Sequence, residues 1–227
     1  MNMITTLKAA SLLALAVALT NAPAATKKEL EETMGQGGLE KVKVKDLDLA
    51  YARPQATLAG YKRVKLEPVE VEFRKSWDPT RTGSAIKLSS EEREKIRAGV
   101  ARVVQEELAR ELEKGSTYRI AGDAGADVLR VKARVLDLYV NAPDVGVGRS
   151  RTLVSSAGEM TLLAELSDSS SGQVLARVAD RREANKGGRM HLVNSVVNEE
   201  EARKIAAGWA RALRKALDKA HGIGPKN

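Results

Sequence analysis

The chain has 227 residues, of which 43% are hydrophobic and 30% charged, and its formal net charge is +8 at pH 7. This composition excludes a disordered or fibrous chain and suits one globular domain. The core of that domain must be aliphatic, because aromatic residues make up only 3% of the sequence. There is no cysteine, which excludes disulfide bonds, thiolate metal sites and a lipid-modified cysteine.

Residues 1–24 have the layout of a cleavable secretory signal peptide. Lys8 supplies the positive charge, residues 9–19 form an apolar run, and Ala22-Pro23-Ala24 places small residues at the cleavage site. As a helix, that run spans about 16 Å, roughly half of a hydrocarbon core. We therefore predict a soluble periplasmic protein without a transmembrane helix. Export makes nucleic acid an unsuitable partner, and the positive charge favours anionic envelope surfaces.

Residues 25–60 are predicted to form a flexible or extended N-terminal arm, because they contain a glycine-rich stretch and a cluster of lysines. An alternation of apolar and charged residues over 41–50 also allows a short extended segment against the domain edge. A single α/β domain is then expected over residues 61–222, followed by a C-terminal tail at 223–227.

The stretch 60–79, GYKRVKLEPVEVEFRKSWDP, predicts the first strand of the domain. Apolar and charged residues alternate on both sides of Pro68, but the phase of the alternation slips by one residue there. A bulge absorbs such a slip, so we predict one strand with a bulge near Pro68. Trp77 either folds back over the core or is an exposed binding anchor.

A helix is predicted after the capping box Ser89-x-x-Glu92, with Gly115 at its C-terminal end. Alternating apolar and polar residues predict a strand over 127–140 and a hairpin of two strands, 158–167 and 173–182. The loop after the first of these strands is a possible partner loop, with Val145, Val147, Arg149 and Arg151.

The last helix is predicted to begin with Asn198 as its N-cap and to end at Gly222. Trp209 lies in the middle of its apolar stripe, and we expect this side chain to fill most of the gap between helix and sheet. The outer face is basic and is a candidate anion or partner surface: Arg211, Arg214, Lys215 and Lys219. The alternative is a solvated face that complements the helix dipole.

The order strand, helix, three strands, helix predicts an α/β (α+β) two-layer sandwich. A four-stranded, mostly antiparallel sheet would carry two helices packed on one face and leave the other face in water. Arginine and glutamate residues on that outer face predict either cross-strand ion pairs or a ligand surface.

These segments together resemble a family of bacterial predicted lipoproteins, known as domain of unknown function family 3313. The resemblance is carried by the 60–79 stretch, by GADVLRVKARVLDL, by DSSSGQVLARVADR and by the WARALRKALD helix, and it covers most of residues 38–221. It implies a place in the cell envelope and no established activity. The chain departs from the lipoprotein description because it has no cysteine to acylate.

Sequence motifs for catalysis are weak. Ser84-x-x-Lys87 matches the S-x-x-K pattern of serine penicillin-binding enzymes, but the helix cap lies later, at Ser89, and no S-D-N or K-T-G follows. His191 and His221 are the only histidines and are expected in solvent, so no metal or cofactor site is predicted. We therefore expect that the protein is not an enzyme.

Three function classes remain open at this point. The first is a non-catalytic accessory or interaction protein of the periplasm or cell envelope, with another envelope protein as partner. The second is a protein that binds an anionic surface, such as lipid headgroups or an envelope polymer, through the basic face of the last helix. The third is a small serine hydrolase at Ser84.

Overall fold

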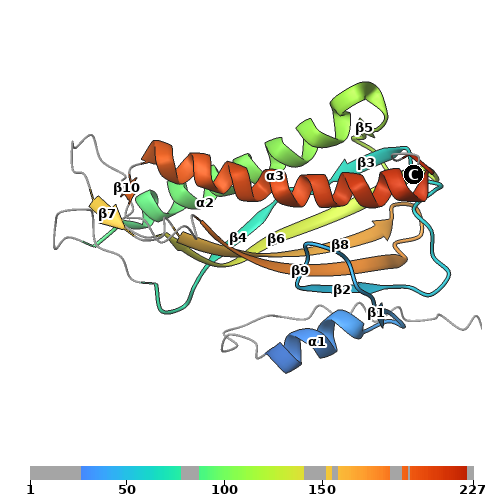
Figure 1. Ribbon diagram of the computed structural model, residues 1–227, viewed down its shortest axis with the longest axis horizontal. Helices are drawn as coiled ribbons and strands as arrows, with labels where there is room; N and C mark the ends of the chain where they lie inside the picture. Colours follow the sequence, from blue (N-terminus) through green and yellow to red (C-terminus); the bar gives the residue numbers. More distant parts are fainter. Residues whose placement is uncertain are drawn as a thin grey trace, which may run out of the picture.

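The computed structural model describes residues 27–77, 87–140, 152–154, 158–184, 191–193 and 195–223. A large open sheet lies between two long helices on one face and one short helix on the other (Figure 1). The elements in chain order are α1 (Lys27–Gly35), β1 (Glu40–Lys41), β2 (Leu49–Ala52), β3 (Arg63–Leu66), β4 (Glu70–Phe73), α2 (Ser90–Glu113), the 3-10 turn η1 (Lys114–Ser116), β5 (Arg119–Ile120), β6 (Val128–Val140), β7 (Thr152–Val154), β8 (Gly158–Asp168), β9 (Val174–Ala184), β10 (His191–Val193) and α3 (Ser195–Ala220).

The large sheet has eight strands in the order β1-β2-β9-β8-β6-β3-β5, and β4 also pairs with β6. The α+β class is confirmed, but the prediction of four strands was wrong. The meander β6–β8–β9 is antiparallel as predicted, whereas β3 and β4 pair in parallel with β6. Strands β1, β2 and β5 have two to four residues each, which is too short for a period-two pattern to be recognised. β7 and β10 form a separate two-stranded sheet.

The phase slip at Pro68 separates β3 from β4. Leu66 pairs with Val131 and Glu70 pairs with Arg134, so four steps along this segment match three steps along β6. One extra residue is thus inserted at the proline, which has no N–H to donate to β6. The prediction of one strand with a bulge near Pro68 was wrong: residues 67–69 lie between two separate strands, and the register irregularity in the pairing with β6 lies between Val71 and Phe73.

The N-terminal segment adds two strands, β1 and β2, and the helix α1 to the domain. β2 pairs antiparallel with β9, and α1 lies on the far side of the sheet from α2 and α3 (Figure 1). Met34 and Leu39 form a small buried cluster there with Tyr51 and Ala179. The sheet face that was predicted to lie in water is therefore covered in part.

The helix ends follow local sequence rules in α2 but not in α3. Ser89 Oγ accepts a hydrogen bond from Glu92 N at 3.2 Å, and Ser89 N donates to the Glu92 carboxylate at 2.8 Å, which confirms the capping box. α3 has already begun at Ser195, so the prediction of Asn198 as its N-cap was wrong. The two valines after Ser195 are β-branched and have a low helix propensity, so the sequence did not predict the first turn of α3. No helix in the described ranges is long and apolar enough to cross a membrane.

The main core lies between the sheet and the two long helices. α2 contributes Val103, Val104 and Leu108, while α3 contributes Ala206, Trp209 and Ala210. Trp77 also folds back over the protein: it is 6% exposed, stacks on Phe73 at 4.2 Å between ring centroids, and donates from Nε1 to the carbonyl oxygen of Val140 at 2.9 Å. The binding-anchor alternative for Trp77 is therefore wrong.

Candidate ligand-binding cavity

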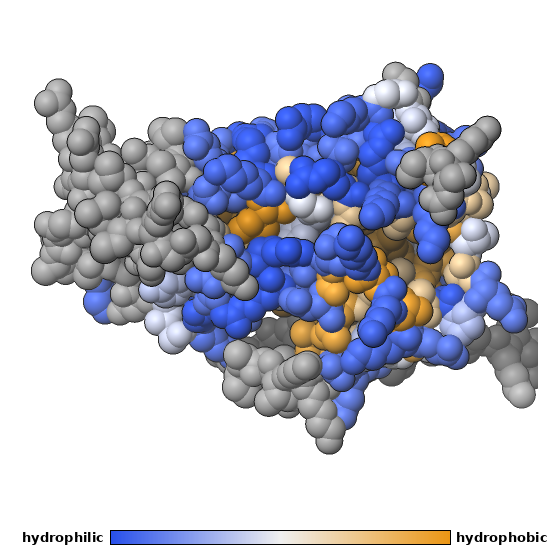
Figure 2. All heavy atoms as spheres, viewed as in Figure 1, coloured by the Kyte–Doolittle hydropathy of each residue, from blue (hydrophilic) through white to orange (hydrophobic). Residues whose placement is uncertain are grey.

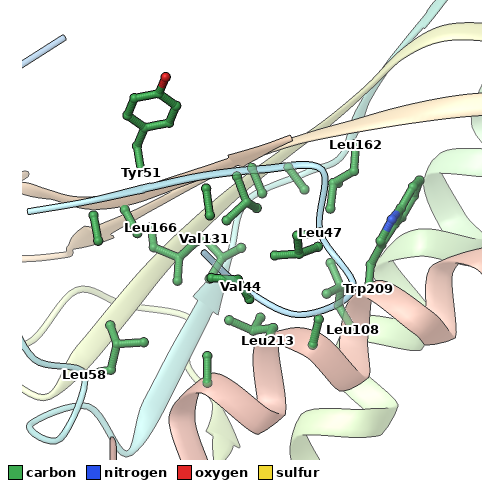
Figure 3. A pocket seen from close by; sticks show the side chains of 18 of the residues that line it. Val44, Leu47, Tyr51, Leu58, Leu108, Val131, Leu162, Leu166, Trp209 and Leu213 are labelled. Atoms are coloured by element: carbon green, nitrogen blue, oxygen red, sulfur yellow. The ribbon is translucent and has the colours of Figure 1, made fainter. Parts of the chain in front are cut away.

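An apolar cavity of about 140 Å³ lies between α3, the sheet and the turn that joins β1 to β2. We call residues 42–47 of that turn the cover segment. Its Val44 and Leu47 side chains face Trp209 and Leu213 of α3 across the cavity (Figure 3). Hydrophobic residues also gather on this side of the molecule, beneath α3, and hydrophilic residues surround them (Figure 2).

Small side chains leave this space open. The sheet presents Ala133, Ala164 and Ala176 to the cavity, and α3 presents Ala212 and Ala216. Protein interiors are normally packed to crystal density, so a row of alanines facing another row leaves a void that larger side chains would fill. We expected Trp209 to fill most of the gap between helix and sheet. It occupies one side of the gap, and the cavity remains beside it.

The lining is almost entirely hydrocarbon. Of the two lining residues with a polar side-chain atom, Tyr51 points to the opposite side of the strands (Figure 3), and Trp209 Nε1 already donates to Asp180 Oδ2 at 2.8 Å. A cavity without free polar groups stays dry and takes apolar ligands; an engineered cavity of about 150 Å³ in another protein binds benzene. The lining therefore offers dispersion contacts and burial, and no acid, base or nucleophile.

A buried carboxylate fastens the cover segment to the rest of the protein. Asp180, which is 1% exposed, accepts hydrogen bonds from Trp209 Nε1, from Asp48 N at 3.2 Å and from Arg182 Nε at 2.6 Å. The Asp48 side chain also binds β9: its Oδ2 accepts a hydrogen bond from the backbone N of Arg181 at 2.8 Å. Arg182 also donates to the carbonyl oxygen of Asp46 in the cover segment. Charge-assisted hydrogen bonds of this kind offset the cost of burying the carboxylate.

Asp180 was missed in the sequence, although a signal for it is present. Val174, Ala176 and Val178 define the apolar phase of β9, and Asp180 is the next residue in that phase. A carboxylate in the apolar phase of a strand predicts a buried partner, because an unpaired buried charge is too costly to retain. Sequence alone does not identify that partner as Trp209.

The four residues predicted to form the basic face of α3 do not all remain exposed. Arg214 turns toward α2, where its Nη1 donates to the carbonyl oxygens of Glu111 at 2.8 Å and of Lys114, and its Nε lies 3.4 Å from Asp218. These carbonyls belong to the C-terminal end of α2, where the last turn leaves acceptors without helical donors. Three of the four predicted residues remain exposed on α3: Arg211, Lys215 and Lys219.

The remaining predicted residues are placed as follows. The possible partner loop, with Val145, Val147, Arg149 and Arg151, lies outside the described residues, and so does Ser84. His221 was expected in solvent but is half-buried, with its ring 5.6 Å from that of Tyr118. No group of three or more His, Asp or Glu side chains within the described ranges could hold a metal ion.

The outer face of the sheet carries cross-strand ion pairs. Five of its cations lie next to a carboxylate on a neighbouring segment, in the pairs Arg130–Glu67, Lys132–Glu70, Arg134–Glu70, Arg177–Glu165 and Arg181–Glu159. This pairing supports the sheet, as one of the two sequence interpretations predicted. It leaves little uncompensated charge there for a ligand.

Comparison with known proteins relates the chain to one family. The model of the family described as "Protein of unknown function (DUF3313)" matches residues 34–213. A search of the curated proteins finds no match.

The solved structures that match this chain share little sequence with it. They include a PelC dodecamer from Paraburkholderia phytofirmans (15% identity, 70% of this chain and 96% of that chain covered, TM-score 0.34). Protein XCC0632 from Xanthomonas campestris, a member of family DUF330, has 12% identity, 74% and 93% coverage and a TM-score of 0.34. The hypothetical protein CT253 from Chlamydia trachomatis has 11% identity, 72% and 97% coverage and a TM-score of 0.35.

Proposed function

This chain belongs to the family described as proteins of unknown function (DUF3313), and we propose that it is a non-catalytic binding protein of the cell envelope. Its ligand is a molecule with an alkyl chain, which enters the cavity between α3 and the cover segment. The observation that carries this proposal is the cavity itself, with about 140 Å³ of space and a lining of aliphatic side chains.

The lining favours binding over catalysis. General acid–base or nucleophilic chemistry requires an ionisable or nucleophilic side chain within hydrogen-bond reach of the substrate. The cavity instead gives a ligand about 0.8 kcal/mol for each methylene that leaves water. The buried carboxylate beside it, Asp180, is held by Trp209 and by the Asp48 amide rather than exposed to the cavity.

The surroundings of the cavity favour a small ligand over a protein. Stable protein interfaces bury at least about 1,200 Å² and are centred on large apolar anchors. Among the described residues, four large hydrophobic side chains are exposed, Val42, Val44, Ile120 and Ile223, and the two valines belong to the cover segment. This surface is too small and too polar for a docked protein, whereas a cavity of this size matches one alkyl chain.

The envelope location is supported by the sequence of residues 1–24, with its charge at Lys8 and its small residues at Ala22 and Ala24. We propose cleavage after Ala24 and release of the mature protein into the periplasm, with peripheral association with the envelope. N-terminal sequencing of the protein purified from a periplasmic fraction tests this part: a start at Ala25 or Thr26 supports it, and an intact Met1 overturns it.

Ligand binding is tested with 1-decanol and the purified protein by isothermal titration calorimetry. Ala216 is exposed at the cavity mouth, so Ala216→Phe fills the entrance without overpacking the core and should weaken binding at least tenfold. Ala98→Phe, at an exposed alanine on α2 away from the cavity, is the matched control and should bind as the wild type does.

Two results overturn the proposal. One is the absence of saturable binding by the wild type, and the other is equal binding by both phenylalanine variants. Sedimentation velocity is run in parallel: a dimer that dissociates in Ala216→Phe alone would assign this face to a second copy of the chain instead.

A further inference from the structure

We infer that the ligand is an amphiphile with a single alkyl chain and an anionic head group, such as a fatty acid anion. The chain lies in the cavity, and the head group lies at its mouth among lysines of the cover segment and of α3. This inference rests on the proposed function and names the chemical class of its ligand.

The cover segment carries two of these lysines. Val42 and Val44 line the cavity, and Lys43 and Lys45, which follow each of them, are exposed. The segment thus presents hydrocarbon toward the cavity and ammonium groups toward solvent within one short stretch. A ligand with an apolar chain and a negative head matches this order of groups.

α3 repeats the arrangement on the other side of the cavity. Ala212 and Ala216 line the cavity, and Lys215 and Lys219 follow them by three residues each. Residues three apart are neighbours on a helix surface, so each lysine lies beside a lining alanine. Both walls of the mouth therefore carry cations.

These lysines are uncompensated, unlike the five paired cations on the outer face of the sheet. Lys43, Lys45, Lys215 and Lys219 form no ion pair with any residue in the described ranges. In contrast, Arg177 and Arg181 on the outer face of the sheet each pair with a glutamate. Exposed cations that surround an apolar opening raise the local concentration of anions and favour a negative head group.

The volume of the cavity limits the number of chains. About 140 Å³ is close to the volume of engineered cavities that hold one benzene molecule. One chain end fits, and two parallel chains do not. The inference therefore specifies a single-chain amphiphile rather than a two-chain phospholipid.

The test compares three probes with the same ten-carbon chain and different heads: decanoate, 1-decanol and decyltrimethylammonium, each below its micelle concentration. Calorimetry on the wild type should give the tightest binding for decanoate, about tenfold tighter than for 1-decanol, and the weakest for the cation. Added salt should weaken decanoate binding and leave 1-decanol binding unchanged, because screening acts on the head group.

Two charge-reversal variants locate the head group. Lys215→Glu with Lys219→Glu should abolish the preference for decanoate and leave 1-decanol binding intact. Lys62→Glu with Lys75→Glu makes the same change of net charge at exposed lysines outside the cavity lining and should retain the preference.

The outcomes separate this inference from the proposed function. Equal binding of decanoate and 1-decanol by the wild type overturns the head-group inference and leaves the cavity function standing. An equal loss of preference in both double variants also overturns it, because net charge rather than the mouth lysines would then be responsible. If none of the three probes binds, the proposed function itself fails.

Discussion

The indole Nε1 of Trp209 donates a hydrogen bond of 2.8 Å to the buried carboxylate of Asp180. The other oxygen of this carboxylate accepts from the backbone amide of Asp48 at 3.2 Å. Three parts of the fold therefore meet at one side chain: the last helix, the strand β9 and Asp48, the residue that follows the cover segment. Trp209 also lines the cavity, so stability and ligand binding share this residue.

Trp209→Ala should lower the free energy of unfolding by roughly 3–5 kcal/mol, because it removes a large buried side chain. Trp209→Phe keeps most of the ring but leaves Asp180 without one donor, and it should cost about 1–3 kcal/mol. Denaturant unfolding measures both values. Arg211→Ala, at an exposed position on the same helix, is the control and should stay within about 0.5 kcal/mol of the wild type. A wild-type midpoint for Trp209→Ala would show that α3 does not pack on the sheet as described.

Asp180→Asn should loosen the cover segment. The amide is nearly the same size as the carboxylate, but it is uncharged and weakens the hydrogen bonds from Arg182, Trp209 and Asp48. Amide hydrogen exchange should become faster for residues 42–48 and remain unchanged at the centre of β6. Asp123→Asn, at an exposed position, is the control. Unchanged exchange in residues 42–48 would contradict the role assigned to Asp180.

Arg214→Ala should destabilise the protein by about 1–3 kcal/mol, because the carbonyl oxygens at the end of α2 lose a charged donor. Arg214→Lys should recover little of this loss, since one ammonium group cannot reproduce the several N–H donors of a guanidinium. Thermal unfolding of the two variants, with Arg211→Ala beside them, gives the comparison. Full recovery by lysine would mean that charge alone is required at this position.

The stability contributed by Tyr61 should fall in alkaline solution. Its hydroxyl donates to Asp168 Oδ2 at 3.0 Å, and burial, followed by this hydrogen bond, raises the pKa of Tyr61 to about 12. The unfolded value is about 10. Because the folded pKa is higher, the stabilisation is complete below pH 10 and is lost as the pH rises toward 12.

Tyr61→Phe provides the measurement for that pH range. The difference in free energy of unfolding between the wild type and Tyr61→Phe should be constant from pH 7 to 9 and should shrink above pH 10. Tyr139→Phe, at a tyrosine of β6, controls for ionisation of tyrosines in general. A difference that grows above pH 10 would reverse the assigned direction of the shift.

Long elements with a clear period were predictable from the sequence. The strands 127–140, 158–167 and 173–182 and the capped helix after Ser89 carry ten or more residues of regular pattern, and local pattern is sufficient at that length. Short strands such as β2 (Leu49–Ala52) form because a partner strand is present, so their own residues contain little signal. The sequence at Pro68 showed the phase slip but not whether the pairing with β6 would be parallel.

The cavity could not be predicted, because it is a property of facing surfaces. Ala164 and Ala216 are unremarkable in their own elements, and the void appears only when the strand and the helix face each other. Of the predicted basic face, Arg211, Lys215 and Lys219 are exposed, whereas Arg214 turns toward α2. The helical period predicts the face of the helix on which a side chain lies. It does not predict the hydrogen-bond acceptors on a neighbouring helix, such as the carbonyl oxygens at the end of α2 that Arg214 binds.

The pairing of Asp48 with Asp180 also sets an order of assembly. The two residues are 132 positions apart, so the hairpin formed by β1, the cover segment and β2 cannot join the sheet until β9 has been made. Contacts that close so long a loop form after the local ones, because the entropy of closure must be met before they stabilise the chain. The meander and the two long helices can therefore form first, with the alanine-lined groove still open to solvent. The hairpin of β1 and β2 is therefore the last of these parts to join the fold, and the cavity acquires its second wall at that step.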